Sequence, residues 1–252
     1  MTQAQKIETT DTTAALPLCY REPVALDAEQ HRELSVAPSP NGFAFASSAH
    51  AVLLAAVEFF EACREFPIIF APTEHGTLNA LALMGVEQGE NLLVDESGTW
   101  QGNYVPAYLR RYPFIPADIG APELPICIDL AFEGLNLEEG QRLFSEAGTP
   151  TDYCRQMQAF LLDYQNQQVL SLAFTTKLKE LGLLTALDAN VQLHDGRKFL
   201  LQGLLVVDEN GLGRLGDQAV LELFRKGYLG LIYAHLASLK NLGRLMELKA
   251  AR

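Results

Sequence analysis

The sequence predicts an α+β fold, with mixed and largely antiparallel strands, a long central helical segment and a C-terminal helical hairpin. Apolar residues recur every three to four positions after Thr151, which is typical of a helix with one buried face. Short apolar runs between turn residues, such as 67–70 and 199–207, favour strands joined by tight connections. From Gly216 onward the pattern is helical, in two pieces that meet near Gly227.

Length and composition indicate one folded domain. At 252 residues, of which 48% are apolar and 20% charged, the chain is long enough to bury a sizeable core. Residues 1–15 are polar and rich in Thr, and we expect them to be disordered. Residues 16–252 are expected to form a single α+β domain, with a turn-rich stretch near 134–150 as the place for any subdivision.

Local signals predict where several elements begin and end. Thr151 is expected to cap the long helix, and Gly182 to end it. Asp195-Gly196 predicts the turn of a β-hairpin between residues 191–193 and 199–207. Asn210-Gly211 predicts a further turn.

Residues 84–114 hold the densest run of turn residues, strand formers and aromatics, including Trp100, the single tryptophan. The segment from Asp95 to Gly98 predicts a hairpin turn, and Pro106 suits the first turn of a short helix. A helix here would align on one face three phenols that are spaced four residues apart. These are Tyr104, Tyr108 and Tyr112.

Two interpretations of these aromatics are open. In the first, Trp100, Tyr104 and Tyr108 form a platform for a flat or peptidic ligand, and Arg110 or Arg111 binds its carboxylate. In the second, the rings fill the core and the arginines lie at its rim. Aromatic residues at helical spacing are more often core residues, so the sequence favours the second interpretation.

His75 is a further candidate for ligand binding. It lies in a loop beside Glu74, where an exposed imidazole can act as a general base. A lone histidine in a loop is more often simply solvated, and the sequence favours that interpretation.

The composition argues against several classes of function. A net charge of −12 argues against nucleic-acid binding, which requires a basic surface. The four cysteines and five histidines are widely spaced, so we expect no metal site, and no glycine-rich phosphate loop predicts a cofactor. No apolar run approaches the length of about 18 residues that a spanning helix needs, and the N-terminus has no secretory signal. We therefore expect a soluble, cytoplasmic protein.

Two segments have helical patterns with broad apolar faces. Residues 55–66 are rich in helix formers, and we expect Val57, Phe60, Ala62 and Cys63 to pack inward. Residues 228–248 carry so many apolar side chains that their helix must be buried in the fold or against another subunit. We expect this helix to dock on its own domain and, from Leu239 onward, to contribute to a homodimer contact.

Several blocks of sequence, spread over about residues 20–241, occur together in one order. They are YREPVALDAEQHREL, AAVEFFEACREFPIIFAP, GENLLVDESGTWQGNYVPAYLRRYPF, RLFSEAGTPT, LLVVDENGLGRL and GYLGLIYAHLASLKNL. On these blocks the chain resembles the bacterial SapC family over nearly its full length. The resemblance implies an association with the bacterial envelope or surface layer and carries over no catalytic residue. Some members are labelled peptide-transporter permeases, but this sequence departs from that label because it has no spanning segment.

The leading hypothesis is therefore a non-catalytic binding or accessory protein with a protein or peptide partner, linked to envelope or surface-layer processes. The alternative is an enzyme, or a modifier of a small molecule or peptide, with its pocket near Trp100 and Tyr104. The sequence favours the binding protein because no motif in it identifies a catalytic group.

Overall fold

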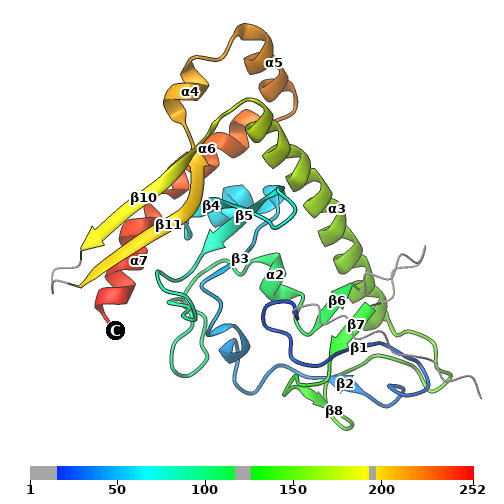
Figure 1. Cartoon of the computed structure of the whole chain (residues 1–252). Helices are drawn as coiled ribbons and strands as arrows, with labels where there is room; N and C mark the ends of the chain where they lie inside the picture. The colour runs from blue at the N-terminus through cyan, green and yellow to red at the C-terminus, as the bar shows by residue number, and fades with distance from the viewer. Residues whose placement is uncertain (1–15, 117–125, 193–196) are drawn as a thin grey trace, which may run out of the picture.

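The computed structural model describes residues 16–116, 126–192 and 197–252 (Figure 1). It confirms the α+β class, with antiparallel sheets, one long helix and a C-terminal helical hairpin. The expected disorder of residues 1–15 and the expected Asp195-Gly196 turn lie outside the described residues.

A five-stranded antiparallel sheet with the order β10-β11-β4-β5-β3 forms the centre of the fold. Its strands are β3 (Ala51–Leu53), β4 (Ile68–Pro72), β5 (Leu78–Leu83), β10 (Leu184–Gln192) and β11 (Lys198–Val207). Two small sheets, β1-β7-β6 and β8-β2-β9, lie at the lower right in Figure 1, at the end of the molecule away from β10 and β11. Their strands are β1 (Pro23–Ala25), β2 (Ser35–Val36), β6 (Phe114–Pro116), β7 (Ile126–Asp129), β8 (Leu135–Asn136) and β9 (Gln141–Arg142).

One helix, α3 (Asp152–Glu180), runs along the side of the molecule and packs on both the small sheets and the central sheet (Figure 1). As predicted, Thr151 caps it, because the Thr151 hydroxyl accepts a hydrogen bond from the Cys154 N–H at 3.2 Å. Gly182 follows its end with a φ of 62°, which glycine adopts without strain. The other helical elements are η1 (Ala44–Ala46), η2 (Ala56–Glu58), α1 (Phe59–Ala62), α2 (Ala107–Arg110), α4 (Glu209–Gly213), α5 (Asp217–Arg225), α6 (Tyr228–Ser238) and α7 (Asn241–Ala250).

The central sheet is covered on both faces. Ile68 and Phe70 of β4 belong to the main core, which they share with residues of α1, α3 and α6. Ile69, between them, faces the other way and packs with Leu245 and Met246 of α7. Helices α6 and α7 therefore contact opposite faces of the sheet, and the single helix predicted over residues 228–248 is broken between them after Ser238. Leu245 and Met246 are buried within their own chain, and the homodimer contact expected from Leu239 onward stays a prediction.

A histidine joins two strands of this sheet that barely pair. Among the described residues, β4 and β11 pair only through Phe70 and Leu205. His235 of α6 bridges the strands beside this pair, because its Nε2 accepts the Val207 N–H at 3.0 Å and its Nδ1 donates to the Ile68 carbonyl at 2.9 Å. Burial lowers the pKa of His235 to about 4, so the ring is neutral near pH 7.

Several local predictions were wrong. Residues 55–66 form a short 3-10 helix and one α-helical turn, and Val57 and Phe60 are 62% and 57% exposed, whereas Ala62 is buried as predicted and Cys63 is half-buried. Asn210-Gly211 lies inside α4 rather than in the predicted turn. The helix after Pro106 is a single turn, so the tyrosines before and after it do not share its face.

Candidate functional site

An open cavity of about 530 Å³ lies beside the small sheets, and five of its 14 lining residues are aromatic. We call it the aromatic pocket. Its main ring pair is Phe45 and Tyr112, which stack at 4.2 Å between centroids with 19° between their planes. The Phe132 ring meets Tyr112 edge-on at 5.4 Å. The lining residues are Val36, Ala37, Pro38, Ser39, Gly42, Phe43, Phe45, Leu109, Arg110, Tyr112, Pro113, Phe132, Gln141 and Tyr153.

Tyr112 is fixed in this wall by a buried carboxylate. Its hydroxyl donates to Asp129 Oδ2 at 3.2 Å, and the Asp129 carboxylate also accepts the backbone N–H groups of Arg21 and Glu22. Burial and the Asp129 charge both raise the pKa of the Tyr112 phenol well above its usual value. The phenol therefore stays protonated near neutral pH, and its ring is held as a rigid wall.

Polar groups lie around the aromatic pocket. Arg110 is exposed, and its Nε donates to the Val105 carbonyl at 3.0 Å. Its guanidinium also lies 5.4 Å from the Phe160 ring and 5.9 Å from the Tyr104 ring, neither of which lines the pocket, so the group is positioned while it remains accessible. A smaller cavity of about 80 Å³ shares Phe45, Tyr112 and Phe132 with the pocket and is also lined by Arg21 and Glu133.

Of the six candidates from the sequence, Arg110 is the one that lines the aromatic pocket. Trp100 is half-buried behind it, where its ring packs on Phe43 at 5.4 Å and on Phe66 at 6.2 Å. The Trp100 indole N–H donates to the Tyr104 carbonyl at 3.1 Å. Trp100 thus packs against Phe43, which lines the pocket, without lining the pocket itself. The hairpin predicted around it is reduced to one isolated bridge, between Val94 and Trp100.

We expect Trp100→Ala to lower the free energy of unfolding by about 3 kcal/mol, because the change removes two ring contacts and a hydrogen bond and leaves a cavity. Urea unfolding followed by circular dichroism measures this loss. A loss below about 1 kcal/mol would contradict the core role and favour the platform interpretation.

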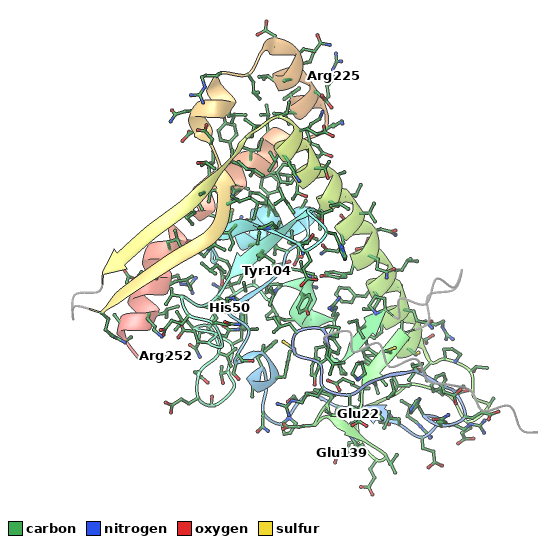
Figure 2. The ribbon with its side chains drawn as sticks, in the orientation of Figure 1. Glu22, His50, Tyr104, Glu139, Arg225 and Arg252 are labelled. Atoms are coloured by element: carbon green, nitrogen blue, oxygen red, sulfur yellow. The ribbon has the colours of Figure 1, made fainter. Side chains whose placement is uncertain are left out.

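Tyr104 lies near the middle of the molecule, away from the small sheets (Figure 2). Its hydroxyl donates to buried Glu58 at 2.7 Å, and burial together with the Glu58 carboxylate raises the pKa of the phenol. It also lines a more polar cavity of about 330 Å³ with Glu61, Arg64, Glu65, Asn103 and Arg244. This is the cavity that fits the predicted pocket near Tyr104, and Trp100 is not among its lining residues.

Tyr108 and Arg111 are buried, at 5% and 6% exposure. The Arg111 guanidinium lies over the Tyr108 ring at 4.1 Å, over Tyr164 at 5.1 Å and over Tyr20 at 5.6 Å. Within the described ranges its Nε has no hydrogen-bond partner. The positive charge of Arg111 is thus stabilised by the faces of phenol rings, whose quadrupoles attract a cation. Its predicted role in binding a carboxylate stays a prediction.

His75 lies at the tip of the loop between β4 and β5, and it is exposed. The backbone of this loop is closed by Thr73 N–H donating to the Thr77 carbonyl at 2.9 Å, with Gly76 at a φ of 75°. His75 lines neither the aromatic pocket nor the cavity beside Tyr104. Among the described residues, no group of three or more His, Cys, Asp or Glu side chains could hold a metal ion.

Sequence reasoning missed most of the aromatic pocket. Phe43 precedes and Phe45 belongs to the 3-10 helix η1, which turns the Phe43 ring toward Trp100 and the Phe45 ring toward Tyr112. One sequence signal for the pocket was available at Tyr112. This tyrosine is the last of the three and is followed by Pro113, so it lies beyond the helix.

A family model described as SapC matches residues 26–245. The chain belongs to the SapC family. The SapC match includes every lining residue of the aromatic pocket and all six candidates from the sequence. No curated protein and no solved structure matches the chain significantly. In the described parts of the chain, no helix is both long and apolar enough to cross a membrane.

Proposed function

We propose that this SapC family member is a non-catalytic binding protein that holds a flat, apolar ligand with an acidic group in the aromatic pocket. The single observation that carries the proposal is the cavity of about 530 Å³ walled by the Phe45–Tyr112 stack. Pockets for small ligands are typically concave, about 300–1,000 Å³ in volume and mostly apolar, with a few polar groups that orient the ligand. Arg110 supplies such a group, since a guanidinium pairs well with an acid.

The chemistry of the lining favours binding over catalysis. The titratable side chains among the described lining residues are Arg110, Tyr112 and Tyr153. Burial raises the pKa of both phenols, so neither accepts a proton near neutral pH. The lining thus suits recognition of a rigid ligand by stacking and charge. The ligand can be a free molecule or an aromatic side chain of a peptide partner.

Membership of the SapC family supports a link to bacterial envelope or surface-layer processes, and this link is part of the proposal. The protein would serve such a process from the cytoplasm, as an accessory that carries or senses a ligand. The predicted homodimer and the lack of a nucleic-acid partner belong to the same proposal, the latter because of the net charge of −12.

The test uses 1-anilinonaphthalene-8-sulfonate, which combines a flat aromatic body with an anionic group. Gln141 is an exposed residue of β9 in the pocket lining, so Gln141→Trp fills the pocket from a surface position. We expect this change to weaken binding at least about tenfold in a fluorescence titration, because the added ring occupies the ligand space. A melting curve confirms that the variant folds.

The matched control is Gln167→Trp, which places the same side chain in a separate cavity of about 540 Å³ beside α3. Binding by this variant should equal that of the wild type. Equal binding by the wild type and Gln141→Trp, or loss of binding in Gln167→Trp alone, would contradict the proposal. Absence of binding by the wild type would contradict it as well.

A further inference from the structure

Three carboxylates are buried among the described residues, and one of them has few hydrogen bonds. The Glu58 carboxylate accepts three hydrogen bonds, and that of Asp129 accepts four. The Glu65 side chain is 6% exposed, yet among the described donors its carboxylate accepts the Asn103 N–H alone, which its two oxygens share at 2.8 and 3.0 Å. A carboxylate has room for about four such bonds, and a buried one that lacks them is costly. Glu65 therefore has unused capacity for a donor.

The cation that pairs with Glu65 does not fill this capacity. Arg244 of α7 places its Nη1 3.9 Å from Glu65 Oε2, which is too long for a hydrogen bond, and its Nη2 donates to the Gln101 carbonyl at 3.3 Å. The chain at Gly102 already lies close against the carboxylate, because a Cβ on this glycine would be 2.5 Å from Glu65 Oε2. Position 102 thus has no room for a side chain that could supply a further donor.

Glu65 and Arg244 both line the cavity of about 330 Å³ that Tyr104 also lines. We call it the polar cavity. Its volume lies in the range of about 300–1,000 Å³ that is typical of small-ligand sites. Its charged lining residues are two acids and two arginines, so the lining is neutral overall, although the chain has a net charge of −12. The second pair, Glu61 and Arg64, is closed at 3.1 Å and largely exposed, so the free bonding capacity lies at Glu65.

The chemistry of Glu65 and Arg244 favours a ligand with both signs of charge. An ammonium group has three N–H donors, so it supplies what the Glu65 carboxylate lacks. A ligand carboxylate pairs with a guanidinium through two parallel N–H donors, and the Arg244 guanidinium is partly exposed in the same cavity. An α-amino acid carries its ammonium and carboxylate groups on one carbon atom. Its two charges are therefore neighbours, as are those of Glu65 and Arg244.

We propose that the polar cavity binds a free α-amino acid, with the ammonium group on Glu65 and the carboxylate on Arg244. The ligand replaces one long ion pair by two direct ones. This site is separate from the aromatic pocket, because no residue lines both cavities. The protein thus has two sites of different chemistry, one for a flat apolar acid and one for a zwitterion.

Isothermal titration calorimetry with each of the standard amino acids in turn tests the proposal. At least one of them should bind with a dissociation constant of about 1 mM or lower. The N-acetyl derivative of that amino acid lacks the ammonium charge, and its amide lacks the carboxylate. Each derivative should bind at least about tenfold more weakly, because one of the two ion pairs is lost.

Two variants test the residues. Glu65→Gln and Arg244→Met should each weaken binding at least about tenfold. Glutamine keeps an oxygen that accepts the Asn103 N–H, and Arg244 is partly exposed, so melting curves should show two folded proteins. If Glu65→Gln does not fold, Arg244→Met alone decides. The matched control is Arg214→Met, which removes an arginine from a surface ion pair outside the polar cavity and should bind like the wild type.

Absence of binding by every amino acid would overturn the proposal, and so would undiminished binding of either derivative. Wild-type affinity in a folded Glu65 or Arg244 variant would overturn it as well. Both variants should bind 1-anilinonaphthalene-8-sulfonate like the wild type, because neither residue lines the aromatic pocket. A parallel loss of sulfonate binding, or equal weakening by Arg214→Met, would show a general effect on the protein and would contradict the site.

Discussion

Replacing Glu58 by alanine is expected to lower the free energy of unfolding by about 3–5 kcal/mol. The Glu58 side chain is buried, and its carboxylate accepts three hydrogen bonds. They come from the Ala55 N–H at 2.9 Å, from the Tyr104 hydroxyl at 2.7 Å and from the Ala107 N–H at 2.7 Å. Alanine would leave all three donors without this acceptor in a low-dielectric interior.

The functional consequence follows from the place of Ala107 at the start of α2. This single turn brings Arg110 to the aromatic pocket and leads directly to Tyr112. Loss of the Glu58 carboxylate should therefore also weaken binding of the aromatic sulfonate. Urea unfolding measures the stability change, and Glu61→Ala is the control, because Glu61 is exposed and pairs with Arg64 at the surface. Similar losses in the two variants would contradict the role assigned to Glu58.

Acidification is expected to remove about 3 kcal/mol of stability through His235 alone. The pKa of this histidine is about 4 in the fold, against 6.5 for an unperturbed side chain. As the pH falls below 6.5, the unfolded chain binds the proton first, so the folded state loses stability until the pH reaches about 4. Protonation of Nε2 would break its hydrogen bond with the Val207 N–H and weaken the junction between β4 and β11.

The measurement is the free energy of unfolding between pH 7 and pH 4. We expect His235→Gln to reduce the slope of stability against pH, whatever its effect at pH 7, because glutamine does not titrate. His75→Gln is the control for the substitution itself, because His75 is exposed and lies in the loop between β4 and β5, away from Val207. An unchanged slope in the His235 variant would contradict the neutral, doubly bonded state of this ring.

Features that depend on neighbouring residues were predictable from the sequence. The Thr151 cap and the Gly182 stop follow from local hydrogen bonding and from the positive φ that glycine allows. The β10–β11 pairing was anticipated from its apolar runs, although β10 begins at Leu184, seven residues before the predicted start at Val191. Helix α3 and the C-terminal hairpin were predicted because their apolar periodicity extends over many turns.

Features that depend on distant residues were not predictable. Phe60 packs outward because the core positions around it are filled by Phe59, Ala62 and Phe174. The aromatic pocket joins Phe45, Tyr112 and Phe132, which come from separate parts of the chain, and their sequence spacing shows no periodicity. In the sequence, Glu58 cannot be distinguished from any other helix glutamate. The groups that bond to its carboxylate belong to the distant loop from Tyr104 to Ala107.

The central claim is that the aromatic pocket is the ligand site, and a crystal structure of the protein grown with 1-anilinonaphthalene-8-sulfonate tests it most directly. The account predicts that the naphthalene ring lies in the pocket against Phe45, Tyr112 and Phe132, with its sulfonate near Arg110. The same experiment on Gln141→Trp should show the pocket filled by the new side chain and free of probe. A wild-type structure with the probe bound only in the cavity beside α3 that Gln167 lines, or only beside Tyr104, or with no probe bound, would contradict the claim.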